Sequence, residues 1–250
     1  MLANSRILLI GAGALGNEVV KNLAQCGIGH IAIVDHDSIE PTNLNRCVFF
    51  QPNDVGNSKA EVLASKVNRS FINTEATSYQ VMCEDIDGSV YEKSDVVVSC
   101  VDNIDTRLTI NRYCSFFGKP LIDGGTTGFN GRVQTVMFPD SACLDCRWRS
   151  LAEELTQQRH RCGHEVEILG SPEPALGITT SAVAAVQSNE VVKMANALNA
   201  ATPDERDSVL STTLIGKMWV MDLVTNLFAV YNTTRDTDCP YHDFGSTYVS

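Results

Sequence analysis

The stretch ILLIGAGALG, residues 7–16, decides the fold of this chain. It opens with four apolar residues of the kind that form a buried strand, and three glycines follow at once in the spacing Gly-x-Gly-x-x-Gly. Leu15, Val19 and Leu23 then recur at helical spacing. We therefore predict a strand, a tight glycine turn and a helix, in that order.

The same alternation continues through the first half of the chain. Apolar strands are predicted at 30–34, 76–81 and 95–100, and helices are predicted to begin after the capping pairs at 57–58 and 102–103. Continuous apolar strands that alternate with amphipathic helices are typical of a parallel sheet with helices on both faces. We therefore predict a Rossmann-like α/β fold with a mostly parallel sheet.

The pattern changes after residue 121. Glycines come close together, and residues 132–138 alternate polar and apolar side chains like a half-exposed strand. We therefore predict an antiparallel extension of the sheet in the C-terminal half. Residues 147–176 are polar, and we expect them to form a long crossover loop with one short helix.

The rest of the chain reads as a helix, two strands and a tail. The helix is predicted at 182–198, with one of the hydroxyl residues at 179–181 as its cap. Strands are predicted at 218–223 and 227–231. They lead into a cysteine-bearing tail at about 235–250, which we expect to bind metal.

Composition narrows the classes of function. The 250 residues carry 19 Lys and Arg against 30 Asp and Glu, and the formal net charge of −11 repels nucleic-acid backbones and anionic lipid. No apolar run approaches the ~20 residues that span a bilayer. We expect a soluble, cytoplasmic protein that folds as a single domain over residues 1–250, with no nucleic-acid or membrane partner.

The cysteines favour a metal site. There are nine, an odd number scattered through predicted strands and helices, which fits reduced thiols better than a disulfide framework. Cys143 and Cys146 can present two thiolates to one tetrahedral metal, and Cys239 with His242 supplies a second pair at the same spacing. We predict a structural Zn²⁺ site, because four protein ligands leave no open coordination position. Two buried thiols are the alternative for the first pair, and three loop residues are alternatives to His242: His160, Cys162 and His164.

The glycine turn predicts a nucleotide site. Between a strand and a helix, it offers free N–H groups and a positive helix end to a phosphate. Asp35 closes the second strand, where its carboxylate can accept hydrogen bonds from both ribose hydroxyls. The backbone groups expected at the nucleotide are those of Gly11, Gly13, Ala14 and Gly16. At this point the nucleotide can be either NAD or ATP. A further alternative is that the glycine turn binds no nucleotide and only allows the helix to pack closely on the strand.

Charged and amide side chains at the other strand ends favour ATP. Asn43, Arg46 and Lys59 follow the second strand, and Asp102 with Asn103 follows the strand that ends near residue 100. Ligands of open α/β sheets bind at these carboxyl ends. A guanidinium and an ammonium neutralise a triphosphate, and a carboxylate can hold Mg²⁺. Hydride transfer by an NAD-binding oxidoreductase needs neither the cations nor the metal-binding carboxylate. Taken singly, Arg46 or Lys59 could be an ordinary surface charge.

Together these motifs closely resemble the ThiF/MoeB/HesA superfamily, the adenylyltransferase core of ubiquitin-activating enzymes. The matching segments are 11–16, 34–37, 43–46, 55–59, 101–103 with Arg107, 143–146 and 177–180. The resemblance implies that Asp35 binds the ribose and Asp102 binds Mg²⁺. It also implies phosphate contacts from Asn43, Arg46 and Lys59.

The resemblance further implies a reaction and partners. The C-terminal glycine carboxylate of a ubiquitin-like or sulfur-carrier protein ending in Gly-Gly would attack the α-phosphate of ATP, giving an acyl-adenylate and pyrophosphate. A homodimer is expected from the resemblance and from the apolar, glycine-rich segment 121–138, and a conjugating enzyme is a further candidate partner. A non-catalytic scaffold of the same family is the other alternative. The family usually completes its zinc site with a fourth cysteine, so His242 is a departure.

A thioester step would need a nucleophilic cysteine. Family members that form a thioester place this residue in or near the crossover loop, which makes Cys162 the candidate, with neighbouring positive charge favouring its thiolate. A stray exposed thiol and a zinc ligand are the alternatives, and Cys47 is the next candidate. Four other cysteines are expected to be small buried side chains: Cys26, Cys83, Cys100 and Cys114.

Overall fold

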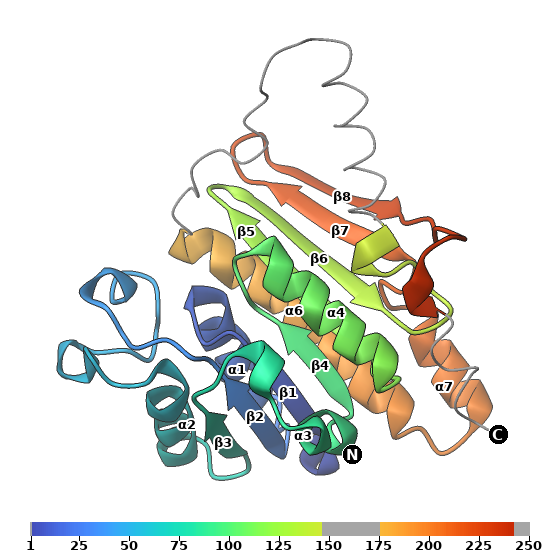
Figure 1. Cartoon of the computed structure of the whole chain (residues 1–250). Helices are drawn as coiled ribbons and strands as arrows, with labels where there is room; N and C mark the ends of the chain where they lie inside the picture. Colours follow the sequence, from blue (N-terminus) through green and yellow to red (C-terminus); the bar gives the residue numbers. More distant parts are fainter. Residues whose placement is uncertain (1, 147–175, 243–250) are drawn as a thin grey trace.

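The glycine turn joins β1 (Arg6–Ile10) to α1 (Ala14–Gln25), as predicted. The computed structural model describes residues 2–146 and 176–242 (Figure 1). The further strands are β2 (His30–Val34), β3 (Glu75–Tyr79), β4 (Val96–Ser99), β5 (Leu121–Thr127), β6 (Asn130–Val136), β7 (Lys217–Asp222) and β8 (Leu227–Asn232). The further helices are α2 (Lys59–Ser70), α3 (Gly88–Lys93), α4 (Ile104–Phe116), α6 (Gly177–Leu198) and α7 (Pro203–Leu210).

The strands form one eight-stranded sheet in the order β3-β2-β1-β4-β5-β6-β7-β8. β3, β2, β1, β4 and β5 run parallel, and β6, β7 and β8 continue the sheet antiparallel. The chain builds outward from β1 to β3 and then returns to place β4 on the other side of β1. The strand order therefore reverses between β1 and β4, which is where open α/β sheets bind ligands. The predicted α/β fold with an antiparallel C-terminal extension is confirmed.

Two apolar layers hold the helices to the sheet. On one face, α1, α2 and α6 pack against alternate residues of the strands, such as Ile7, Leu9 and Ile33. On the opposite face, α3 and α4 cover the other residues of the same strands, such as Leu8 and Val97. Figure 1 shows α4 in front of the sheet and α6 behind it. Both faces of the parallel strands are thus buried, which explains their continuous apolar sequences.

β6 is more deeply buried than the sequence predicts. Its alternation of polar and apolar residues suggested a half-exposed strand, but residues 133–136 are all buried. Val133 packs on the face covered by α6, and Gln134 on the other face donates a hydrogen bond to the carbonyl of Ala142 at 3.2 Å. A helix on one face and the segment after β6 on the other exclude water from both, so a polar side chain such as Gln134 lies inside.

Several helix boundaries follow the predicted caps. The side chains of Ser58 and Asn103 accept hydrogen bonds from the first turns of α2 and α4. α6 differs, because it begins at Gly177, five residues before the predicted start. The hydroxyl of Thr180 hydrogen-bonds to the carbonyl of Gly177 at 2.8 Å inside that first turn, so it does not cap the helix. Neither α3 nor α7 was predicted, although Thr202 and Pro203 form an ordinary helix start for α7.

No helix in the described ranges is both long enough and apolar enough to cross a bilayer.

Candidate functional site

The glycine turn after β1 lies directly against the turn after β4. Gly11 has a φ of +99°, and a Cβ atom there would lie 2.8 Å from the carbonyl carbon and oxygen of Cys100 and 3.1 Å from the amide nitrogen of Val101. A Cβ atom at Gly16 would lie 1.9 Å from the carbonyl oxygen of Gly11. Both positions therefore require glycine. The close approach sets the turn that carries Asp102 beside the N-terminus of α1.

The N-terminus of α1 faces this turn without a capping side chain, because its N-cap residue is Gly13. The first-turn N–H groups, including that of Ala14, have no earlier helical carbonyl to bond. Such a helix end carries partial positive charge and suits a phosphate. The first-turn N–H groups of Ala14 and Gly16 can thus meet a phosphate, whereas the predicted N–H group of Gly11 donates to the carbonyl oxygen of Val34 at 2.9 Å.

Asp35 stands at the end of β2 next to the glycine turn. Its carboxylate accepts a hydrogen bond from the amide of Ala12 at 2.6 Å and another from the amide of Asp37 at 2.8 Å. Burial raises the pKa of Asp35, and these backbone hydrogen bonds oppose that rise. The carboxylate is therefore fixed at the edge of the turn, where the sequence predicted a ribose contact.

Lys59 lies in the first turn of α2 and is tied to Asp37 twice. Its amide donates to the carbonyl of Asp37 at 3.0 Å, and its ammonium group pairs with the Asp37 carboxylate at 2.7 Å. Burial is the largest single influence and acts to lower the pKa of Lys59, but the hydrogen bond to Asp37 and the negative charges of Asp35 and Asp37 together raise that pKa above its ordinary value. The sequence analysis gave Asp37 no role. The pattern Val34-Asp-His-Asp37 contained it, but its contact with Lys59 depends on folding.

Arg46 and Asn43 lie in the segment after β2. The Arg46 guanidinium donates to the carbonyl of Thr42 at 2.6 Å. The side-chain oxygen of Asn43 accepts a hydrogen bond from the amide of Glu40 at 2.9 Å, in a capping box around a short 3₁₀ helix (Pro41–Asn43). This leaves the amide NH₂ of Asn43 as the group that can donate to a phosphate.

Cys47 marks the point at which these charges converge. Burial raises the pKa of its thiol to about 11, and the charges of three predicted site residues act on the same sulfur: Arg46, Lys59 and Asp35. Arg46, Lys59 and Asp35 therefore lie in the same neighbourhood of the fold, near Cys47.

Asp102 and Asn103 follow β4. Asp102 is exposed in the turn that touches Gly11. The side-chain oxygen of Asn103 accepts a hydrogen bond from the amide of Thr106 at 2.8 Å and caps α4, so the structure gives it a structural contact. A carboxylate oxygen beside a phosphate-binding turn is the donor that Mg²⁺ prefers, so the residues present fit that ion.

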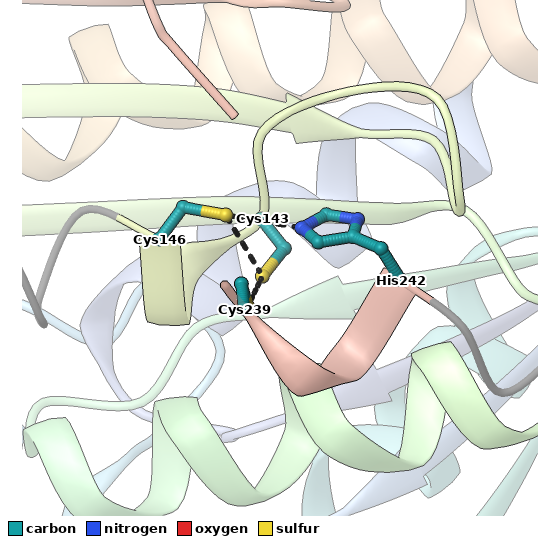
Figure 2. Close-up of side chains that lie close together, drawn as sticks. All are labelled: Cys143, Cys146, Cys239 and His242. Atoms are coloured by element: carbon teal, nitrogen blue, oxygen red, sulfur yellow. Dashed lines mark hydrogen bonds between the residues drawn. The ribbon is translucent and has the colours of Figure 1, made fainter. Parts of the chain in front are cut away.

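A second group of side chains forms a candidate metal centre on the α4 face of the sheet. Cys143, Cys146, Cys239 and His242 are all buried, and their ligand atoms lie within 4.8 Å of one another (Figure 2). The sulfur of Cys143 is 3.7 Å from the sulfurs of both other cysteines. Tetrahedral zinc with Zn–S bonds of about 2.3 Å separates its sulfur ligands by about 3.8 Å, so the donor set fits zinc.

His242 is oriented as metal-binding histidines usually are. Its Nε2 atom lies 3.0 Å from the sulfur of Cys146, and its Nδ1 atom is 3.1 Å from the carbonyl of Pro139. A hydrogen bond at one ring nitrogen fixes the tautomer that leaves the other nitrogen free to bind a metal. The fourth member of the cluster is therefore the residue predicted from the tail, and its alternatives at 160, 162 and 164 lie outside the described residues.

Helix α4 supports this cluster. The side chain of Asn111 accepts a hydrogen bond from the amide of Leu144 at 3.1 Å and donates to the carboxylate of Asp145 at 2.8 Å. Ser115, one turn further along, donates to the carbonyl of Tyr241. One face of α4 therefore holds both halves of the cluster, the knuckle at 143–146 and the tail at 239–242.

The eight cysteines of the described ranges are free thiols, and their burial corrects one expectation. Cys83, Cys100 and Cys114 are buried as predicted, but Cys26 is exposed, because it caps the C-terminal end of α1. Cys162 lies outside the described residues.

The fold and these sites define a class of protein, an α/β domain with a candidate nucleotide site at its glycine turn and a candidate metal centre on the α4 face of its sheet. The chain belongs to the ThiF family, whose model matches residues 1–241. Among curated relatives, the NEDD8-activating enzyme E1 catalytic subunit of Caenorhabditis elegans is 39% identical over 158 residues, which are 58% of this chain and 37% of that protein. Ubiquitin-activating enzyme E1 1 of Schizosaccharomyces pombe is 39% identical over 148 residues, 54% of this chain and 15% of that protein.

The chain therefore matches only a minor part of the length of these relatives. Among solved structures, MccB of E. coli crystallised with ATP superimposes with a TM-score of 0.73 at 21% identity, over 96% of this chain and 67% of that one. PaaA superimposes with a TM-score of 0.69 at 17% identity, over 93% of this chain and 74% of that one. These structures share the fold of this protein.

Proposed function

We propose that this protein adenylates the C-terminal glycine of a small ubiquitin-like or sulfur-carrier protein at the expense of ATP. The observation that carries the proposal is the contact between the turn at Gly11 and the turn that bears Asp102, with Asp35 bonded to the first of these turns. This contact brings the N-terminus of α1 and the carboxylates of Asp35 and Asp102 to one edge of the sheet, an arrangement that would suit a nucleotide with its metal ion. Membership of the ThiF family and similarity to ubiquitin- and NEDD8-activating enzymes support the same reaction.

In this proposal each residue has one task. Asp35 accepts hydrogen bonds from the ribose hydroxyls, and the N–H groups in the first turn of α1 bind phosphate oxygens. The amide of Asn43 donates to a phosphate, and the cationic side chains of Arg46 and Lys59 neutralise the triphosphate. Asp102 holds Mg²⁺, which would shield the charge of the phosphates.

The chemistry is a displacement at phosphorus. An oxygen of the carrier's terminal carboxylate forms a bond to the α-phosphorus of ATP, while the bond from that phosphorus to the bridging oxygen of the β-phosphate breaks. The products are an acyl-adenylate and pyrophosphate, so no proton has to move. Positioning and charge neutralisation supply the rate enhancement, because the nucleophile is already ionised at neutral pH.

Two other functions receive less support. An NAD-binding oxidoreductase would use the glycine turn and Asp35 but would have no task for Arg46, Lys59 or Asp102. A non-catalytic scaffold would not need these charges to meet around Cys47. A thioester step through Cys162 stays a proposal for the same enzyme, and its onward partner would be a conjugating enzyme.

We also propose that Cys143, Cys146, Cys239 and His242 hold one structural Zn²⁺. The matching sulfur separations and the orientation of His242 support this assignment. Four protein ligands leave no open position for a substrate, so the metal would tie the tail to the loop after β6.

The assembly is proposed to be a homodimer in the cytoplasm. The segment at 121–138, which the sequence analysis suggested as part of the interface, forms β5 and β6 inside the sheet, and each pairs with a neighbour on both sides. It therefore cannot extend an interface through its strand edges. β8 is the exposed edge on this side of the sheet, and it carries the apolar side chains Phe228, Val230 and Tyr231.

The test is exchange of labelled pyrophosphate into ATP in the presence of a carrier that ends in Gly-Gly. We expect the wild-type protein to catalyse exchange and Asp102→Ala to reduce it by at least about 100-fold, because a metal ligand at developing charge contributes several kcal/mol. Asp105→Ala, an exposed carboxylate in the first turn of α4, is the matched control and should retain activity. Wild-type exchange in Asp102→Ala would overturn the role of Asp102, and no exchange with any such carrier would overturn the function.

A further inference from the structure

Arg107 is a buried cation that the proposed function does not use. It lies in the N-terminal part of α4 and is 5% exposed. Its guanidinium donates to the carbonyl oxygen of Val101 and, at 2.8 Å, to that of Gly124, and it pairs with the carboxylate of Asp123. One planar group thus meets three acceptors from two chain segments, which a guanidinium fork can do and a lysine ammonium cannot.

These contacts link the end of β4 to the middle of β5 and to β6. Val101 follows β4, and Asp123 and Gly124 belong to β5. The second oxygen of Asp123 lies 3.0 Å from the guanidinium of Arg132 on β6. Arg107 therefore holds the turn between β4 and α4 against the neighbouring strands, where burial strengthens each polar contact.

The bond to Val101 matters because Asp102 is the next residue. On its other side the same turn touches Gly11, where a Cβ atom would lie 3.1 Å from the Val101 amide nitrogen. The glycine turn thus confines the Cys100–Val101 peptide, and the guanidinium of Arg107 holds the next peptide, Val101–Asp102, which leads into Asp102. The exposed carboxylate of Asp102 is carried on a backbone that these contacts fix.

We propose that Arg107 is a positioning residue for the metal site: it holds the Val101–Asp102 peptide so that the Asp102 carboxylate faces the phosphates bound at the glycine turn. The proposal rests on the function given above. Because the guanidinium is buried and engaged by protein acceptors, Arg107 acts through Asp102. Residues that orient metal ligands in this way typically change metal affinity by about 10–100-fold when they are replaced.

Two variants disturb this arrangement in different ways. Arg107→Lys keeps the positive charge and loses the fork that reaches Val101 and Gly124. Gly125→Ala keeps every polar group, but its Cβ atom would lie 3.2 Å from Nη2 of Arg107 and 3.2 Å from Nε of Arg132. Arg112→Lys is the matched control, because it makes the same change on the same helix at a half-exposed position.

The measurement is the affinity for Mn²⁺ in the presence of ATP, followed by electron paramagnetic resonance, together with the affinity for ATP without metal. We expect Arg107→Lys to weaken Mn²⁺ binding by about 10–100-fold and to leave metal-free ATP binding within about twofold of wild type. In pyrophosphate exchange, kcat should fall while the KM for ATP at saturating metal stays constant. Arg112→Lys should match wild type throughout.

The possible results distinguish a failure of the role proposed for Arg107 from a failure of the proposed function. Wild-type Mn²⁺ affinity in a folded Arg107→Lys protein would overturn the proposal, as would an equal loss of metal-free ATP binding, which would indicate general damage to the pocket. If Arg107→Lys does not give the circular dichroism spectrum of a folded protein, Gly125→Ala decides by the same measurement. A wild-type protein that binds ATP and Mn²⁺ but exchanges no pyrophosphate would overturn the proposed function alone, and one that binds no Mn²⁺ with ATP would overturn this inference.

Discussion

The ion pair between Lys59 and Asp37 links the proposed phosphate ligand Lys59 to the segment that follows β2 and that begins with Asp35, the proposed ribose ligand. The pair lies near the surface, so its contribution to stability is of the order of 0.5–1 kcal/mol. Its geometry matters more than its energy. Both the backbone amide and the ammonium of Lys59 bond to Asp37, and the first turn of α2 is thereby fixed beside the nucleotide site.

This pair predicts a pH dependence. The hydrogen bond to Lys59 holds the pKa of Asp37 below its ordinary value even though burial opposes it, and the pKa of Lys59 is raised. The stabilisation from Asp37 is therefore present at neutral pH and is lost as pH falls through its folded-state pKa; that from Lys59 is lost as pH rises through its own. We expect Asp37→Asn to lower Tm by about 1–4 °C at pH 7.

The difference in Tm between Asp37→Asn and wild type should shrink towards zero in acid, below the ordinary Asp pKa of 3.8. Differential scanning calorimetry between pH 3 and pH 8 measures it. Asp85→Asn removes an equal charge at an exposed position and serves as the control. A difference that persists unchanged into acid would show that the ion pair is not its source.

Cys47 is predicted to be chemically inert. Because burial raises the pKa of its thiol to about 11, the thiolate fraction at pH 7.5 is on the order of 10⁻³ to 10⁻⁴. Among the cysteines that the structure describes, we expect iodoacetamide to label the exposed Cys26 first and to leave Cys47 unmodified in the native protein, as measured by mass spectrometry of the tryptic peptides. A carrier thioester that survives Cys162→Ala and disappears in Cys47→Ser would contradict this prediction.

At the scale of elements, the sequence predicted those parts of the fold that depend on local chemistry. The glycine turn, the caps at Ser58 and Asn103 and the strands near it all follow from neighbouring residues. The start of α6 could not be predicted from neighbouring residues, because the hydroxyl of Thr180 can either cap a helix or form a hydrogen bond inside the helix's first turn. The burial of β6 depends on which elements cover it, and that information lies far away in the chain.

The same division holds for the candidate sites. The metal cluster was predictable because each half is a pair of ligands three residues apart, and only the meeting of the halves required folding. The sequence identified Arg107 only as part of a family motif. Its proposed role in positioning Asp102 depends on the carbonyl groups of Val101 and Gly124, which come together only when β4 and β5 pair. Sets of metal ligands can be recognised from residues that are close together in the sequence. The contacts that orient such ligands join residues that are far apart in the sequence.

The metal cluster also predicts how the C-terminal elements respond to metal removal. Protein purified without chelator should contain about one Zn²⁺ per chain, and a strong chelator should lower Tm by on the order of 10 °C, because metal binding is coupled to folding. His242→Ala should lose the metal and His160→Ala should retain it, as measured by elemental analysis. The reverse result would reassign the fourth ligand, and carefully prepared protein without zinc would remove the site.

For the whole molecule, the exposed edge of the sheet predicts self-association. β8 carries Leu227, Phe228, Val230 and Tyr231, each about half exposed, and among the described residues no strand pairs with its outer edge. Such apolar exposure is unusual at the edge of a sheet. We expect a homodimer in multi-angle light scattering, with Val230→Glu raising its dissociation constant at least about tenfold. Val224→Glu, in the turn before β8, is the control.

An unchanged dimer in Val230→Glu would place the interface elsewhere on the molecule. A monomer mass that does not depend on concentration, together with full exchange activity, would exclude the dimer itself.

Helix α4 has one consequence that extends across the molecule. Its cap and the Asp102 turn lie at one end, and Asn111 and Ser115 hold the metal cluster further along the same 13-residue helix. If the proposed zinc and nucleotide both favour the ordered state of this helix, their binding is thermodynamically linked, and the linkage is reciprocal. Whatever factor zinc contributes to nucleotide affinity, bound nucleotide returns to zinc affinity. A cell that keeps this protein saturated with ATP would thereby also protect it against zinc depletion.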